Sequence, residues 1–360
     1  MKKNLRTLLL LAAAIWTVSS CDDDDPKVPA FTDEPCAVVV NQGAMGYLSG
    51  TLDLLSLTDG TYTTGYAELG GTPENVVECG GYLFIPLNEE NSIAVYDKSS
   101  LLRSATIAVP APQSICTDGA RVFAVGNDSI FRISATTLAV EAKDTVGHTA
   151  FACTYTGGSV YVNVGRTYGQ YTGGTTVAKV NPETLAVQQI EVGINPYSQI
   201  ATDGSGNVYT VCQGNYYDVL PTVYRIASDG TSTPICNGTL IDCYGGKLYV
   251  AYRTSSYDEA WNEISTTTYK TYALGSATPV AEDFISAAAE APAAATFLRV
   301  NPENGEVFIG TNGVTDGGFV SYLTSGHVYR YAPTGALLAK YDAGVSPYAI
   351  AFVTRHRVAE

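Results

Sequence analysis

The sequence predicts an all-β fold built from a repeated unit of short strands, and three observations support this. Residues 76–85 (VVECGGYLFI) form two apolar runs around a Gly-containing turn, a pattern typical of a β-hairpin. The same pattern recurs at residues 115–125, 152–164, 200–211, 242–252 and 297–310. The small residue of the first run falls at Cys79, Cys116, Cys153, Ala201 and Cys243, in steps of 37, 37, 48 and 42. The composition, with 35 Gly, 25 Tyr and only 15% charged residues, suits strands and turns. A repeat of this length made only of strands predicts a β-propeller, whose four-stranded blades surround a channel.

The N-terminal residues predict an exported, lipid-anchored protein. Lys2, Lys3 and Arg6 precede an apolar run at residues 8–18, which is too short to span a bilayer and is typical of a signal peptide. Residues 18–21 (VSSC) resemble the lipobox of bacterial lipoproteins, which implies lipidation of Cys21. We therefore expect a lipoprotein signal peptide at residues 1–20 and a lipidated Cys21 followed by an acidic tether, residues 21–35.

Four aspartates follow Cys21 directly, at residues 22–25, and this acidic run has two interpretations. Adjacent carboxylates repel one another, so the run is at least a solvated tether. It also resembles the export signal that places Bacteroidota lipoproteins on the outer face of the outer membrane. We expect a protein held at the outer membrane by lipid and facing the cell exterior.

Charge and cysteine content exclude two classes of function. The net charge is −15, and removal of Lys2, Lys3 and Arg6 with the signal peptide makes it −18, which is unsuited to binding nucleic acid. Four of the seven remaining cysteines share one repeat position, so they are expected to be buried packing residues on innermost strands rather than disulfide partners. No CxxC or HxxxH spacing indicates a metal site.

Strand by strand, the chain predicts seven blades and about 28 strands in a propeller at residues 36–354, followed by a C-terminal tail at residues 355–360. The third strands are expected at residues 51–57, 91–97, 128–134, 175–181, 221–227, 267–273 and 326–332. The first blade lacks its innermost strand, and residues 349–353 (AIAFV) supply one. The N- and C-terminal strands are therefore predicted to pair in one sheet, which removes the open edges of the ring.

Two irregular connections stand out in this regular scaffold. Residues 252–267 are expected to form the longest loop between a second and a third strand. Residues 286–296 (SAAAEAPAAAT) are a long connection that could form one helical turn before Pro292. Irregular loops on a rigid scaffold commonly carry function.

Large aromatic residues gather on the rim that holds the long loops, whereas Asp-Gly, Asn-Pro and Gly-Gly turns occupy the other rim. Exposed aromatic side chains give rigid contact area with a polar tip. The candidate ligand-binding residues on the long-loop rim are Tyr47, Arg166, Tyr168, Tyr171, Tyr197, Tyr216, Tyr217, Tyr252, Arg253, Tyr257, Trp261, Tyr322 and Tyr348. Some of these side chains could instead fold back to cover the channel. A wide, Tyr-rich rim suits a large polar ligand such as a glycan or a macrocyclic cofactor.

Motifs for catalysis are missing from the sequence. No GxSxG, HExxH or Gly-rich phosphate motif is present, and the chain has three histidines. His148 and His327 are expected on or beside the aromatic rim. No catalytic residue, metal ligand or catalytic cofactor is therefore predicted.

Residues 37–43 (AVVVNQG), 50–62 (GTLDLLSLTDGTY) and 180–187 (VNPETLAV) carry a resemblance to a known family. The chain resembles the YncE-like seven-bladed propellers, and more narrowly the surface lipoproteins of the BtuG type, over residues 36–353. The resemblance implies binding of cobalamin or related corrinoids and their transfer to a TonB-dependent outer-membrane transporter of the BtuB type. No individual corrinoid contact can be carried over to this sequence.

The sequence thus predicts a non-enzymatic surface protein that captures a corrinoid. A glycan-binding surface lipoprotein is the alternative, in which Trp261 and the tyrosines stack on sugar rings. A propeller lyase is a third hypothesis, which requires His148 and His327 to meet beside an acid.

Overall fold

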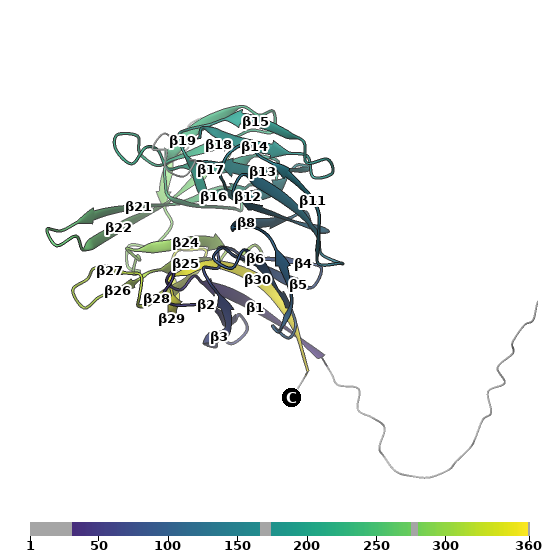
Figure 1. Ribbon diagram of the computed structural model, residues 1–360. Helices are drawn as coiled ribbons and strands as arrows, with labels where there is room; N and C mark the ends of the chain where they lie inside the picture. The colour runs from purple at the N-terminus through teal and green to yellow at the C-terminus, as the bar shows by residue number, and fades with distance from the viewer. Residues whose placement is uncertain (1–30, 166–173, 275–279, 359–360) are drawn as a thin grey trace, which may run out of the picture.

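The computed structural model describes residues 31–165, 174–274 and 280–358. In this part of the chain every regular element is a β-strand, and seven four-stranded antiparallel sheets are arranged as the blades of a propeller (Figure 1). The innermost strands of successive blades contact one another around the whole ring, including the pair that joins the last blade to the first. The predicted seven-bladed β-propeller is therefore confirmed. None of the described residues form a helix that could cross a bilayer.

We number the blades in chain order and give their strands from the innermost to the outermost. Blade 1 is β30 (Pro347–Val358), β1 (Phe31–Asn41), β2 (Gly50–Ser56) and β3 (Tyr62–Gly70). Blade 2 is β4 (Val77–Cys79), β5 (Tyr82–Leu87), β6 (Ser92–Asp97) and β7 (Arg103–Ala108). Blade 3 is β8 (Pro112–Thr117), β9 (Arg121–Gly126), β10 (Ser129–Ser134) and β11 (Ala139–Thr145). Blade 4 is β12 (Ala150–Thr156), β13 (Ser159–Val164), β14 (Thr176–Val180) and β15 (Val187–Glu191).

The remaining three blades follow the same order. Blade 5 is β16 (Pro196–Thr202), β17 (Val208–Cys212), β18 (Thr222–Ile226) and β19 (Ser232–Asn237). Blade 6 is β20 (Leu240–Tyr244), β21 (Lys247–Tyr257), β22 (Glu263–Ala273) and β23 (Ala281–Asp283). Blade 7 is β24 (Ala295–Val300), β25 (Val307–Thr311), β28 (Ser325–Tyr331) and β29 (Leu337–Val345). A short ribbon of β26 (Gly313–Val314) and β27 (Val320–Ser321) lies in the connection between β25 and β28.

Burial explains why the second and third strands of most blades are rich in apolar residues. Both faces of these strands are covered by the neighbouring blades, so β5 and β17 are buried along nearly their whole length. The outermost strands β7 and β11 are mostly exposed, and about half of their residues are polar. The core is therefore a series of layers between blades. In one such layer, Phe308 of blade 7 packs with Ala37 and Val39 of blade 1.

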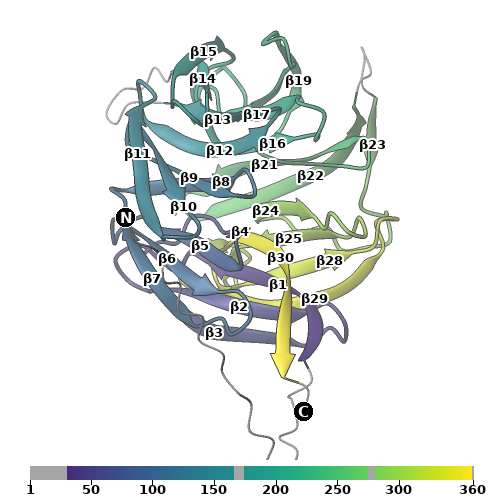
Figure 2. The ribbon, with the colours of Figure 1, turned by 90° about the vertical axis from the view of Figure 1, so that its right-hand side faces the viewer.

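The two ends of the chain close the ring, as the sequence predicts. β1 pairs with β30 from Phe31 opposite Val358 to Asn41 opposite Pro347, and with β2 on its other side. β1 begins five residues before the expected Cys36, and β30 continues past residue 354, so the paired ribbon extends beyond the blade (Figure 2). With β30 in place, β1 is a central strand and presents no open edge.

A buried carboxylate holds the seam between blades 1 and 7. Asp53 is fully buried in β2, and its Oδ2 accepts hydrogen bonds from the Tyr62 hydroxyl (2.9 Å) and from the backbone N–H of Gly344 in blade 7 (3.0 Å). The Tyr62 ring stacks on Tyr341 of blade 7 with ring centroids 4.9 Å apart. Side-chain contacts thus join the outer strands of the first and last blades as well as the inner ones.

The cysteines of the described chain are all unpaired thiols. Cys79, Cys116 and Cys153 are buried on innermost strands, and Cys243 on β20 is partly buried. In these positions they fill space between blades. Cys21 lies outside the described residues.

Two expectations about irregular segments are wrong. Residues 252–267 form mostly strand, because β21 and β22 pair as far as Tyr257 opposite Glu263, and only residues 258–262 remain as a loop. This long hairpin projects from the ring (Figure 1). Residues 286–296 contain no helical turn. They run as turns and irregular chain into β24, because Pro292 cannot donate a helical hydrogen bond.

Candidate functional site

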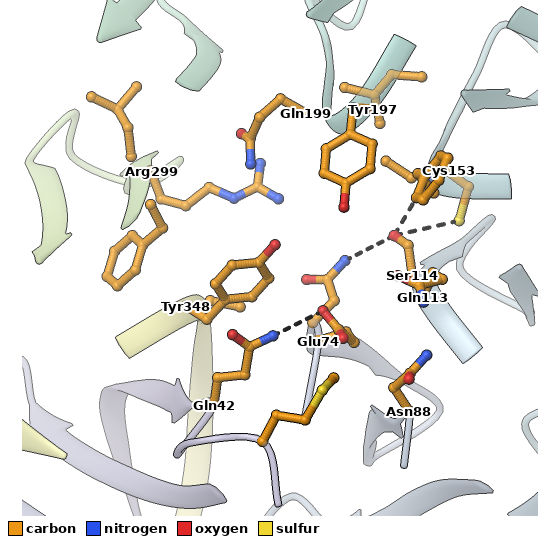
Figure 3. Close-up of a pocket in the computed structure, with 18 residues that line it drawn as sticks. Gln42, Glu74, Asn88, Gln113, Ser114, Cys153, Tyr197, Gln199, Arg299 and Tyr348 are labelled. Atoms are coloured by element: carbon orange, nitrogen blue, oxygen red, sulfur yellow. Dashed lines mark hydrogen bonds between the residues drawn. The ribbon is translucent and has the colours of Figure 1, made fainter. Parts of the chain in front are cut away.

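One residue from each blade surrounds the mouth of the channel on the long-loop rim. Each lies within three residues of the start of the innermost strand of its blade, and we call these seven residues the mouth positions. They are Glu74, Gln113, Phe151, Tyr197, Leu240, Thr296 and Tyr348. They line two adjoining cavities of about 380 and 370 Å³. Because Gln42, Gln199 and Tyr348 border both cavities, the two form one bipartite depression, whose larger half is shown in Figure 3.

A β-bulge places the side chain at five of the mouth positions. The pairing of the innermost strand with its neighbour skips a residue at Gln113, Phe151, Thr296 and Tyr348, and skips Tyr197 together with the two residues after it. A residue left out of the ladder is freed from strict alternation, so its side chain can turn to the channel instead of packing between blades. A proline precedes three of these five positions, at Pro112, Pro196 and Pro347, where its missing N–H suits the interrupted ladder.

Side-chain amides dominate the polar lining of the depression. Seven of them contribute, from blades 1, 2, 3, 5 and 7 or their connections: Gln42, Asn75, Asn88, Gln113, Gln199, Gln213 and Asn312. Asn75 Nδ2 donates to Ser114 Oγ at 3.4 Å, and Asn88 Nδ2 donates to the Pro112 carbonyl at 3.3 Å. These bonds orient the two amides, and Asn75 Oδ1 also accepts a hydrogen bond from the backbone N–H of Val76 at 2.8 Å. An amide both donates and accepts hydrogen bonds, so the lining suits a neutral ligand rich in such groups.

One acidic and one basic side chain, Glu74 and Arg299, line the larger half of the depression. The carboxyl of Glu74 accepts a hydrogen bond from Gln42 Nε2 at 3.1 Å, and burial raises the pKa of this carboxyl to about 8. Arg299 comes from β24 on the other side, and its guanidinium extends towards Gln199 (Figure 3). Its Nη1 lies 3.5 Å from Oδ1 of Asp242, an acid whose pKa is raised by burial in spite of the Arg299 charge. Glu74 and Arg299 thus have separate partners.

A hydrogen-bonded network around Glu263 borders the smaller half. Glu263 Oε1 accepts from Arg253 Nη2 at 2.8 Å and from the Ser255 hydroxyl at 2.6 Å, while Oε2 accepts from the Tyr322 hydroxyl at 2.7 Å. Although burial opposes ionisation, these hydrogen bonds and the Arg253 charge keep the pKa of Glu263 below its usual value. The network joins the β21–β22 hairpin to the β26–β27 ribbon, so Arg253 and Tyr322 are held in place before any ligand arrives.

The structure describes ten of the thirteen aromatic and arginine residues predicted for the rim, and these ten fall into three groups. Tyr197, Arg253, Tyr322 and Tyr348 line the depression. Tyr47, Tyr216, Tyr217, Tyr257 and Trp261 stand exposed on the loops above it. Tyr252 lies within β21 and borders neither cavity, and Arg166, Tyr168 and Tyr171 lie outside the described residues.

Among the described residues, the exposed apolar side chains of this rim form an arc at four of the seven blades. They lie on residues 42–49, 213–221, 257–261 and 314–323, which belong to blades 1, 5, 6 and 7. Tyr217 is 92% exposed and Trp261 82%, so these rings are not folded back onto the channel. Blades 2 and 3 have short connections at residues 88–91 and 127–128. In the described part of the rim, projecting loops therefore border the depression at blades 1, 5, 6 and 7. The rim is low at blades 2 and 3, where the connections are short.

The two rim histidines do not meet. His148 lies in the connection between blades 3 and 4, and His327 lies on β28 of blade 7, across the ring. His327 Nε2 is 3.4 Å from Asp342 Oδ1 on the adjacent strand. Neither histidine lines the depression, so the arrangement required by the lyase hypothesis is not formed by these residues.

Sequence reasoning missed the amides and Glu74, which lie deeper than the exposed aromatics. A signal for them was present, because the residue that follows Pro73, Pro112, Pro196 or Pro347 is always a mouth position. The spacing from these residues to the small residue of the repeat varies with the bulges. The mouth positions therefore do not recur at a regular spacing in the sequence.

Comparison with known proteins shows the fold alone. No family model matches the chain, and no curated protein matches it. Among solved structures, the chain is similar to the hydrazine synthase of Kuenenia stuttgartiensis, with a TM-score of 0.61 and 11% identity over 80% of this chain and 96% of that chain. It is also similar to a candidate 6-phosphogluconolactonase from Bacteroides uniformis, with a TM-score of 0.59 and 12% identity over 89% and 100% of the two chains. A corresponding protein from Bacteroides fragilis gives a TM-score of 0.56 and 12% identity over 89% and 98%. Structures of this propeller type are thus associated with different activities, and the ligand must be inferred from the site.

Proposed function

We propose that this protein is a lipid-anchored surface protein that captures a corrinoid at the mouth of its propeller and passes it to a TonB-dependent outer-membrane transporter. It binds without carrying out a reaction. The observation that carries the proposal is the lining of seven side-chain amides beside an arc of exposed aromatic residues.

The lining is complementary to the edge of a corrin ring, which carries several amide-bearing side arms. Amides on the protein and on the ligand can each donate and accept, so they pair without placing a charge in a partly buried site. Gln42 and Gln199 lie where the two halves of the depression meet, within reach of arms that enter either half.

The shape of the depression supports a ligand that lies across the mouth. Each cavity, at about 380 or 370 Å³, is too small to enclose a corrin macrocycle, but the two together can receive its peripheral groups. The exposed arc, including Tyr217 and Tyr257, then covers the apolar edge of the ring. The low side at blades 2 and 3 leaves a path for the ligand to enter and to leave.

The position of the mouth fits a surface role. β1 begins at Phe31 at the rim of tight turns, and the mouth lies at the opposite rim. A lipid on Cys21 attaches the chain from the side of the tight turns, so the mouth is directed away from the anchor.

A glycan is the second candidate ligand. The specific observation in its favour is the exposed pair of Tyr257 and Trp261 at the tip of the β21–β22 hairpin, with ring centroids 6.2 Å apart. Exposed aromatic rings of this kind can stack on sugar rings.

Calorimetric titration of residues 26–360 with cyanocobalamin and cobinamide, and with a panel of oligosaccharides, tests the proposal. We expect one-to-one binding of the corrinoids. Gln199→Ala removes an amide shared by both halves and is expected to weaken binding about tenfold, as for the loss of one hydrogen bond to a polar ligand. Leu102→Ala is the matched control, because Leu102 is 70% exposed on the opposite rim and should leave affinity unchanged. Binding of oligosaccharides without corrinoids would favour the second candidate, and binding of neither would refute both.

A further inference from the structure

Glu74 is chemically different from the rest of the lining. Among the described residues it is the only carboxyl that borders the larger half of the depression, where the other polar groups are mostly amides, hydroxyls and phenols. Its Oε2 accepts the hydrogen bond from Gln42, and Figure 3 shows the carboxyl group at the cavity with this bond drawn. Oε1 is then the oxygen that can serve a ligand.

No basic group neutralises this carboxyl within the described part of the chain. The only cation on the cavity wall is Arg299, which is engaged with Asp242 on β20. Two acids in the connection between β5 and β6 are also engaged elsewhere. Glu89 accepts from the Thr72 hydroxyl, and Glu90 accepts from the backbone N–H of Gly71.

The remaining titratable groups of the cavity wall are Tyr197, Tyr348 and the thiol of Cys153. Burial raises the pKa of Glu74, the hydrogen bond from Gln42 partly opposes the change, and the resulting pKa is about 8. Glu74 is accordingly a neutral acid over most of the physiological range.

We propose that Glu74 binds the ligand as a neutral carboxylic acid, with Oε1–H donating a hydrogen bond to a carbonyl oxygen of the ligand. This inference rests on the proposed function. In this arrangement Oε2 acts as the carbonyl-like oxygen that accepts from Gln42. Ionisation removes the donor and places a negative charge opposite the carbonyl oxygen. Ligand affinity therefore falls as Glu74 loses its proton.

This role defines the chemical class of the ligand. A neutral acid among amides favours a ligand that presents uncharged carbonyl groups, such as primary amides. A ligand carboxylate can share the Glu74 proton, and the two acids repel each other only when both are ionised. A corrinoid in which side-arm amides are hydrolysed to acids should therefore lose affinity more steeply than the intact amide form as Glu74 ionises.

The test is the affinity of cyanocobalamin for the soluble chain, residues 26–360, at pH 6.5, 7.5, 8.5 and 9.0. With a carboxyl that titrates near pH 8, we expect affinity at pH 9.0 to be about tenfold weaker than at pH 6.5. Glu74→Gln keeps a donor at the same place and cannot ionise, so it should bind about as tightly as the parent at pH 6.5 and show no loss at pH 9.0. Glu259→Gln, which removes an exposed carboxylate from the same rim, is the matched control and should keep the pH dependence of the parent.

The outcomes separate this proposal from the proposed function. Binding at pH 6.5 with no weakening at pH 9.0, or equal weakening in Glu74→Gln, overturns the role of Glu74 and leaves corrinoid capture intact. If cyanocobalamin does not bind at pH 6.5, the capture proposal fails, and infrared titration of the ligand-free chain decides on Glu74. A protonated carboxyl band that disappears near pH 8 and is absent from Glu74→Gln supports the neutral acid, and titration near pH 4.5 overturns it.

Discussion

The buried acid at the mouth predicts how the stability of the folded chain changes with pH. Burial raises the pKa of Glu74 from 4.5 to about 8, so between these values the folded chain keeps a proton that the unfolded chain has released. The stability associated with this proton is fully present below pH 4.5 and is lost as the pH rises through 8. A pKa difference of one corresponds to about 1.36 kcal/mol, which gives a ceiling of about 5 kcal/mol for the whole change. Because the carboxyl borders an open cavity, we expect about 2 to 4 kcal/mol.

Urea denaturation of the parent chain and of Glu74→Gln from pH 5 to pH 9 measures this effect. Other groups titrate in both chains, so the difference between the two free energies of unfolding isolates Glu74. The advantage of the parent over the variant should shrink steadily between pH 5 and pH 8 and level off above that. Parallel curves for the two chains would refute the raised pKa, and with it the physical basis for a neutral acid in the site.

Three further predictions concern the fold. Removal of residues 347–360 deletes β30, and because β1 then loses its inner partner, size-exclusion chromatography should show no folded monomer. Phe308→Ala should lower the free energy of unfolding by about 3 to 5 kcal/mol in urea titrations, since Phe308 is fully buried, whereas the exposed Leu338→Ala should cost less than about 0.5 kcal/mol. Glu263→Gln leaves Arg253 without its ion-pair partner, and we expect a loss of about 1 to 3 kcal/mol together with faster amide hydrogen exchange at residues 253–257.

The propeller could be predicted from the sequence because each blade repeats the same alternation of apolar runs and turns. The spacing of Cys79, Cys116 and Cys153 gave the repeat, and the missing inner strand of the first blade pointed to residues 349–353. Burial between stacked blades forces the middle strands to be apolar, and a periodic constraint of this kind is visible in one sequence.

The depression could not be predicted in the same way because its side chains depend on local interruptions of that pattern. A bulge at Gln113, Phe151 or Tyr348 removes one side chain from the alternation between the two faces of the strand. The periodicity of the strand does not indicate which residue is bulged. The β21–β22 hairpin was missed for a related reason. Its outer half, around Thr254 and Thr266, is exposed and polar, so it lacks the apolar pattern by which strands are recognised.

The central position of β1 has a mechanical consequence. The hydrogen bonds of both of its ladders lie perpendicular to the strand, so a pull on the chain before Phe31 stresses them in shear. They must then break together rather than one after another from an open end. A tether that enters through this strand can therefore resist a drag force on the propeller without peeling the first blade apart.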